Sequence, residues 1–145
     1  MLNAFVEAVY DALAGDTGAG SLQEKINPTS AADKKIYHVL ARQDATFPYI
    51  TIGLLTDVPV GVFGALDNME DATVYVNIFS NSGSVKEAGE ILDLVKAVLD
   101  NDDLTITGYA NDMKCMREYI GAVLYDPDTK VFQVPLRYRI WAEKD

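Results

Sequence analysis

The chain is poor in the side chains that most often carry chemistry. Its 145 residues include one cysteine, Cys115, and one histidine, His38. One cysteine cannot form an internal disulfide, which favours synthesis in a reducing cytoplasm. A zinc site needs several Cys or His ligands, and a Cys–His nucleophile pair has no local signature here. We therefore expect a buried thiol, an ordinary packed or half-exposed histidine, and neither a metal nor a cofactor.

Long apolar runs and positive charge are also scarce. No apolar segment approaches the ~20 residues that span a bilayer, and no basic region followed by an apolar block marks a signal peptide. Twelve Lys and Arg face 22 Asp and Glu, giving a net charge of −10. Such a surface repels phosphate backbones and anionic lipids, so we expect neither sequence-specific nucleic-acid binding nor membrane binding. The charge either keeps the protein soluble or lets DNA slide past without sticking.

Two short motifs match catalytic or phosphate-binding signatures in sequence but lack their structural context. Asp16-Thr17-Gly18 matches the aspartic-protease triplet, but no apolar strand precedes it and no second copy follows, so a turn is favoured. Gly83-Ser84-Val85-Lys86 lacks the upstream glycine of a phosphate-binding loop and is typical of a helix cap. No catalytic residue is predicted, and the chain is not expected to be an enzyme.

The clearest pattern is a strand followed by a helix. Thr73–Phe79 is rich in β-branched and aromatic residues with period-two apolar positions. Ser84 then provides a helix cap, with Glu87 at the reciprocal capping-box position. The residues up to Leu99 carry one apolar stripe at three- and four-residue spacing. This unit is predicted to form the middle of the core.

Further elements follow from the same rules of periodicity and capping. We expect helices at Leu2–Leu13, ended by Gly15 with a positive φ, and at Ser21–Ile26. We expect strands at Lys35–Arg42, Pro48–Leu55 and Leu104–Tyr109, and a hairpin of Lys114–Tyr125 with Lys130–Ala142. The order predicts an α+β fold: a mostly antiparallel sheet with the N-terminal helix and the central amphipathic helix packed on it, and a C-terminal β-hairpin.

The last predicted strand has two different faces. Phe132, Val134, Leu136, Tyr138 and Ile140 form the predicted core face. Pro135 lacks a backbone donor, which predicts a strand that is bulged or at a sheet edge. Arg137 and Arg139 share the opposite face. They are either ordinary surface charges or partners for acids of a neighbouring subunit.

The stretch from Asp57 to Ala72 breaks the pattern of its surroundings. It contains proline, glycine and four acids but no basic residue. The stretch is either a long loop or an extended hairpin arm, and long ordered connections are usually functional. The candidate interface consists of Val60, Val62, Phe63, Leu66 and Asp67 from this stretch, together with Arg137 and Arg139.

The order of these motifs resembles a known family. The N-terminal helix and glycine-rich turn are followed by Lys35-Ile36-Tyr37, by Pro48-Tyr49, by Val74–Ser80 running into the central helix, and by the turn Asp126-Pro127-Asp128. The chain is similar to the tail-completion, or tail-terminator, proteins of long-tailed bacteriophages, found also in prophages and gene transfer agents. The similarity spans nearly the whole chain as a pattern of apolar positions; residues 57–72 are longer than the family pattern.

The resemblance implies a structural virion protein made of one domain over residues 1–145. Six copies would form a ring at the head-proximal end of the tail tube, stop tube polymerisation and join the head-closure or connector protein. Genomic DNA would pass through the ring without specific binding, and assembly would take place in the host cytoplasm. Two alternatives stay open: another neck component, such as a head-closure or adaptor subunit, or a small homo-oligomeric binding domain that holds a partner on its edge strand.

Overall fold

The computed structural model describes residues 3–29, 33–62, 65–100, 102–109 and 113–143. Seven strands form one sheet in the order β1-β2-β3-β7-β5-β4, with β6 paired to β7. The strands are β1 (Ile36–His38), β2 (Tyr49–Val62), β3 (Ala65–Ser80), β4 (Asp102–Leu104), β5 (Met113–Ile120), β6 (Leu124–Asp126) and β7 (Val131–Glu143). Among the strands described, only the pairing of β1 with β2 is parallel.

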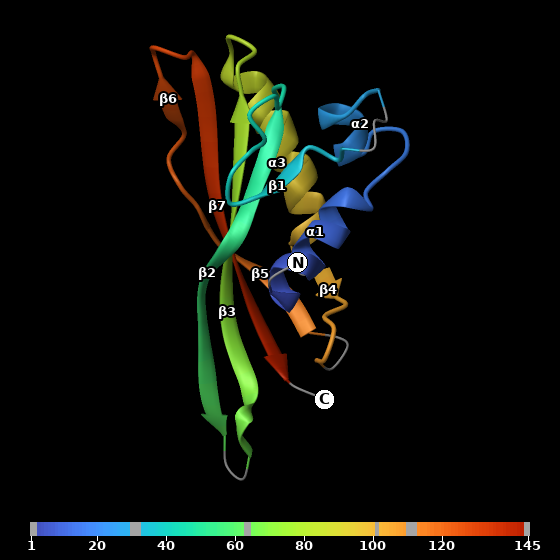
Figure 1. Cartoon of the computed structure of the whole chain (residues 1–145), viewed down its shortest axis with the longest axis vertical. Coiled ribbons are helices and arrows are strands. Elements are labelled where there is room, and N and C mark those ends of the chain that lie inside the picture. The colour runs from blue at the N-terminus through green and yellow to red at the C-terminus, as the bar shows by residue number, and fades with distance from the viewer. Residues whose placement is uncertain (1–2, 30–32, 63–64, 101, 110–112, 144–145) are drawn as a thin grey trace.

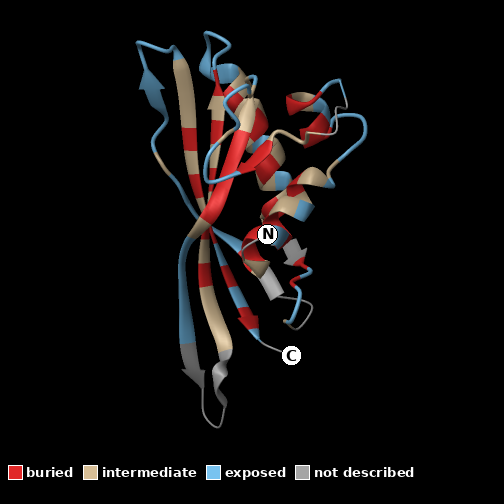
Figure 2. Ribbon diagram, viewed as in Figure 1, coloured by how far each residue is buried: buried red, intermediate tan, exposed pale blue. Residues whose placement is uncertain are grey.

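Three helices cover one face of this sheet (Figure 1). They are α1 (Ala4–Ala14), α2 (Leu22–Ile26) and α3 (Val85–Leu99). The core lies between α1, α3 and the inward-facing residues of β2, β3 and β7, where Figure 2 shows the buried residues alternating along the strands. The predicted α+β class, the two main helices and the core face of the last strand are confirmed. No described helix combines the length and apolar character needed to cross a membrane.

Local signals fix the helix starts. Asn3, Ser21 and Ser84 cap α1, α2 and α3 by accepting hydrogen bonds from the first free backbone N–H groups. Two predicted details are wrong. Glu87 accepts a hydrogen bond from the Ser80 hydroxyl (2.7 Å) and thereby joins the helix to the end of β3. Gly15 ends α1 with φ −82°, because the last turn continues in right-handed geometry.

The predicted loop at 57–72 is wrong, and the alternative of a hairpin arm is correct. β2 and β3 pair from Tyr49–Phe79 down to Val62–Ala65, including Asp57 with Ala72. The hairpin continues well past the layer of helices (Figure 1). We call residues 55–72 the arm. Residues 55–59 are all exposed, so solvent reaches both faces of β2 there. This explains why this part of the sequence lacks the pattern of a half-buried strand.

The prediction that the last strand lies at a sheet edge is also wrong, because β7 lies between β3 and β5. The pairing of β7 with β5 is irregular, with a register shift between Arg117 and Tyr119 of β5. Pro135 is tolerated in this central strand for a local reason. It pairs with Asn77 of β3, while its carbonyl accepts from Gly121 N–H (2.8 Å) on the other side. Its missing N–H therefore points toward residues 121–123, where β5 has ended and β6 has not begun, so no ladder bond is lost.

Three further boundaries differ from the predictions. The strand predicted at Lys35–Arg42 is reduced to β1, which ends where Val39 adopts φ 68°. The strand predicted at Leu104–Tyr109 ends at Leu104, because β4 begins earlier and pairs with β5 through three residues. The first strand of the C-terminal hairpin is divided into β5 and β6, since Gly121 approaches Pro135 so closely that a Cβ there would lie 2.8 Å from its Cγ.

Candidate interaction surfaces

The arm contains most of the residues predicted to form an interface. Val60 and Val62 lie in the last part of β2, and Leu66 and Asp67 lie at the start of β3. Phe63 lies outside the described residues, as do the side chains of the other four. Nearer the body, Leu55 and Val58 are exposed large apolar side chains on β2. The arm thus presents apolar surface to solvent, and the interface role of its tip stays a prediction.

Two side-chain contacts hold the base of the arm against the body. Glu70 accepts a hydrogen bond from Tyr109 (2.7 Å), whose pKa is raised by burial and by this bond. Asp71 accepts two hydrogen bonds from the Arg139 guanidinium, one of them 2.8 Å from Nε to Oδ1. The bond from Arg139 lowers the pKa of Asp71. The arm therefore leaves the body in a fixed direction.

The sheet face away from the helices carries arginine and aromatic side chains. Arg139 is partnered within the chain by Asp71 and lies 5.2 Å from the centre of the Trp141 ring. Arg137 lies 4.9 Å from the centre of the Tyr119 ring. Arg137 has no ion pair within the described part of the chain. The structure thus accounts for Arg139 as an internal partner of the arm and leaves Arg137 available to an outside acid.

The outer edge formed by β5 and β6 is rich in exposed apolar side chains. β4 pairs with β5 only through Met113–Cys115, so no described strand covers the edge from Met116 onward. Half of the exposed large hydrophobic residues lie within this short stretch: Met116, Tyr119, Ile120, Val123, Leu124 and Tyr125. An uncovered apolar edge of this kind is a candidate contact site for another chain.

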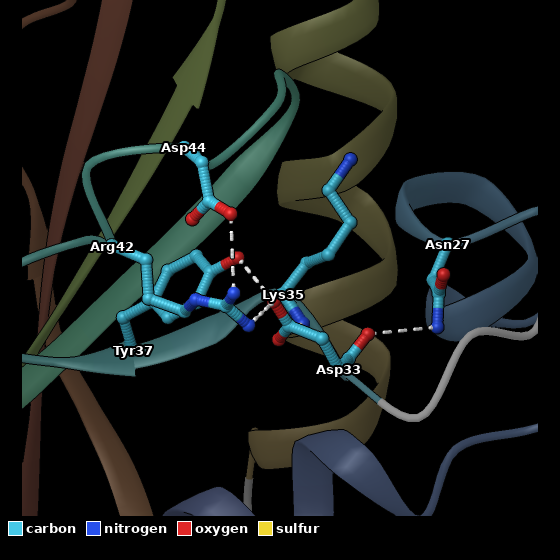
Figure 3. A network of polar contacts seen from close by, with 6 residues as sticks. All are labelled: Asn27, Asp33, Lys35, Tyr37, Arg42 and Asp44. Carbon is cyan, nitrogen blue, oxygen red and sulfur yellow. Dashed lines mark hydrogen bonds and ion pairs between the residues drawn. The ribbon is translucent and has the colours of Figure 1, made fainter.

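A polar network under α3 is structural (Figure 3). Asp33 accepts hydrogen bonds from the Tyr37 hydroxyl (2.8 Å), from Lys35 N–H (2.9 Å) and from Arg42 (3.3 Å). Burial works against ionisation of Asp33, but these donors outweigh it and its pKa is lowered. Burial and the bond to Asp33 raise the pKa of Tyr37 to about 12. The adjoining hollow of about 500 Å³ contains acids and bases together, so the network holds the segment before β1 in place.

The residues considered for chemistry do not converge. His38 is exposed at the end of β1, whereas Cys115 is buried in β5. Asp16 accepts from Leu22 N–H (2.9 Å), as expected of a turn residue at the start of α2. Across the described ranges, no group of three or more His, Cys, Asp or Glu is placed to hold a metal ion.

Sequence reasoning missed the edge of β5 and β6 and the internal partner of Arg139. The first had a local signal, because residues 116–125 carry apolar and aromatic side chains without strict alternation. The second had none, since Asp71 and Arg139 meet only through the long-range pairing of β3 with β7. Long-range pairing is not encoded in short sequence windows.

The fold is an α+β sheet with exposed apolar side chains along its edges, a form suited to contact with other chains. The model of the family described as Tail completion protein gp17 matches residues 7–143. The chain belongs to this tail completion family, and it is a structural component of the phage virion, not an enzyme. Association with other tail or head proteins of the phage follows from that role.

Two solved structures share the fold. A chain from the virion of a native gene transfer agent particle has a TM-score of 0.76 at 13% identity, over 97% of this chain and 95% of that one. A second structure has a TM-score of 0.58 at 12% identity, over 96% and 95%. No curated protein matches in sequence.

Proposed function

We propose that six copies of this chain close into a ring at the head-proximal end of the tail tube. The ring stops tube polymerisation, offers the surface that joins the head-closure or connector protein, and lets genomic DNA pass through its lumen. Membership of the tail completion family supports a place in the tail. The likeness to a chain of a gene transfer agent virion supports a fold suited to such particles.

The observation that carries the proposal is the pair of uncovered contact features at opposite sides of one sheet. The arm extends from β2 and β3, and the open edge of β5 and β6 lies on the far side of β7. Two unlike surfaces on one subunit produce head-to-tail contacts, and head-to-tail contacts close into a ring when the rotation per subunit fits. The candidate residues of the arm tip, with Arg137, then contact the neighbouring subunit or the tube.

Net charge supports the passage of DNA. Six copies of a chain with a net charge of −10 carry about 60 negative charges. Acids that face the lumen would repel the phosphate backbone and prevent adhesion.

Particles assembled without this protein test the position of the ring. We expect overlong tails detached from DNA-filled heads, as seen by negative-stain electron microscopy. Tails of normal length that fail only to attach would instead identify a head-closure or adaptor subunit. Normal attached tails would contradict the proposal.

The arm tip can be tested without disturbing the body. Pro59 and Glu70 pair across the hairpin, so Val60–Met69 can be replaced by Asn-Gly, a pair that closes a two-residue hairpin turn. We expect a folded subunit that no longer supports head–tail joining in a complementation assay. The control is Val85→Ser, on α3 and remote from the arm. Wild-type infectious titre from the shortened arm would refute an interface at the tip.

A further inference from the structure

The sheet face away from the helices carries a compact group of interface-type side chains on β5 and β7. Tyr119 of β5 pairs with Arg137 of β7, Met116 pairs with Arg139, and Trp141 lies beside Arg139. We call these five residues the arginine–aromatic patch. Tyr119, Met116 and Trp141 are 40%, 41% and 47% exposed. Arginine, methionine and aromatic residues are enriched at protein interfaces, so the composition of the patch is that of a contact surface.

The two arginines of the patch differ in their partners. Asp71 accepts hydrogen bonds from Arg139, and Glu118 also attracts Arg139. Arg137 lies over the Tyr119 ring at 4.9 Å and has no ion pair among the described residues. A guanidinium over an aromatic ring still directs its N–H donors outward in its own plane. Arg137 is therefore presented to an acid from outside the chain.

The helix side of the molecule carries acids that lack a nearby cation. α1 contains no lysine or arginine, and its Glu7 and Asp11 are exposed one turn apart, without an ion pair in the part of the chain described. Like charges at this spacing destabilise a helix. Asp11 also lies in the last turn, where the helix dipole disfavours an acid. A cation from outside, placed between the two acids, would offset both costs.

We propose that the arginine–aromatic patch of one copy packs on α1 of the next copy, with Arg137 between Glu7 and Asp11. This contact rests on the proposed ring and names a pair of surfaces that closes it. The two surfaces lie on opposite faces of the molecule, and α1 and β5 lie at similar heights along its long axis (Figure 1). A rotation about an axis parallel to that direction brings the surfaces of neighbouring copies together.

The occupant of the patch is a second copy because the charges match only in one arrangement. Two patches placed face to face would set Arg137 against Arg137 and would close as a two-fold dimer, which cannot continue into a ring. Patch against α1 sets a cation against two acids. Each copy then gives one surface and receives the other, so the contact repeats from copy to copy.

Exchange of charges tests the contact on the full-length chain. Arg137→Glu should raise the protein concentration needed for ring assembly about tenfold or more, because like charges across a contact are costly. Glu7→Lys and Asp11→Lys, added to the same chain, should restore assembly. The control is Lys86→Glu, which makes the same change of charge at an exposed residue in the first turn of α3 and should leave assembly unchanged. Circular dichroism verifies that each variant is folded.

Cross-linking gives a second measurement that leaves Arg137 in place and decides the question if Arg137→Glu unfolds. Met116 and Asp11 are exposed, whereas the native Cys115 is buried. With Met116→Cys and Asp11→Cys in one chain, we expect a short bis-maleimide to give a ladder of covalent oligomers. Either variant alone should run as a monomer in denaturing electrophoresis. The control pair is Met116→Cys with Val85→Cys, because Val85 is 48% exposed but lies at the start of α3.

The outcomes separate this contact from the ring itself. Arg137→Glu rings that assemble at the wild-type concentration overturn the contact and leave the proposed ring standing. Rings that form but no longer join tail or head proteins assign the patch to a different partner and also overturn it. A covalent dimer from Met116→Cys alone, or an equal ladder from the Val85 control pair, does the same. A chain that forms no ring, either free or on tail tubes, overturns both proposals.

Discussion

At the scale of single residues, the contact between Asp71 and Arg139 fixes the base of the arm to β7. The Asp71 side chain is 18% exposed and the Arg139 side chain 45% exposed, so solvent screens the pair only in part. The carboxylate accepts two guanidinium bonds in a fork geometry that lysine could not provide. The contact between Asp71 and Arg139 therefore fixes the orientation of the arm relative to β7 and also attracts the arm to β7.

The lowered pKa of Asp71, caused first by the hydrogen bond from Arg139, predicts a pH-dependent stability. A group whose pKa is lower in the folded state stabilises the fold above its unfolded pKa of about 3.9 and loses that effect as the pH falls through the folded value. Asp71→Asn should therefore lower Tm at pH 7, and its difference from wild type should shrink below pH ~4. Thermal melts at several pH values measure this.

Asp93→Asn, on the exposed side of α3, is the matched control, because it makes the same chemical change away from any arginine fork. Its Tm should stay close to that of the wild type at pH 7. An Asp71→Asn variant that melts like the wild type at pH 7 would show that the fork adds nothing to stability.

At the scale of elements, two glycines in regular structure behave in opposite ways. Gly53 of β2 lies under the Tyr75 ring of β3, and a Cβ there would lie 2.4–2.7 Å from ring atoms. Gly89 of α3 has nothing within 4 Å of an added Cβ. Gly53→Ala should destabilise the fold by about 1–3 kcal/mol through overpacking. Gly89→Ala should stabilise it by roughly 0.5–1 kcal/mol by restoring helix propensity.

Denaturant unfolding of the two glycine variants provides the measurement, because each adds one methyl group, Gly53→Ala into occupied space and Gly89→Ala into open space on a helix. Equal shifts of the same sign would contradict the close approach of Tyr75 to β2. A destabilised Gly53→Ala that recovers with Tyr75→Ala in addition would locate the cost in that ring contact.

The elements that could be predicted are those with local signals. Ser84 and the apolar stripe up to Leu99 specify α3 by short-range rules alone, and the alternation from Val134 to Ile140 specifies the buried face of β7. The length of β2 and β3 could not be predicted, because Pro59 and the acids of the arm are typical of a loop when the partner strand is unknown. Pro135 fits in a central strand only because β5 ends beside it, and this depends on pairing between residues far apart in the sequence.

The candidate interface was likewise predictable only where its residues carry local sequence signals. Composition between Asp57 and Ala72 was enough to single out the arm, and strand alternation put Arg137 and Arg139 on one face. Neither the composition nor the strand alternation could show that Arg139 pairs with the arm of its own chain. The open edge from Met116 to Tyr125 was hidden because β7, with its proline, is the strand whose sequence is typical of an edge.

At the scale of the whole molecule, the positive charges of the uncovered sheet face are few against the total. Arg139 is compensated by Asp71, so Arg137 is the remaining cation there without an acid among the described residues. One such charge per copy is small beside a net charge of −10. The long-range field that DNA would meet is therefore repulsive, even near the half-buried Arg137.

This balance predicts that the protein does not hold duplex DNA. Ordinary non-specific DNA binders have a Kd of about 10⁻⁴–10⁻⁶ M at physiological salt, and we expect binding weaker than that range. Fluorescence anisotropy of a labelled duplex measures it, with a basic protein of similar size as the positive control. Arg137→Gln should leave the result unchanged, because one charge per copy does not reverse the field. Binding within that range that weakens steeply with added salt would show a basic track on the surface, and it would contradict the proposed passage of DNA without adhesion.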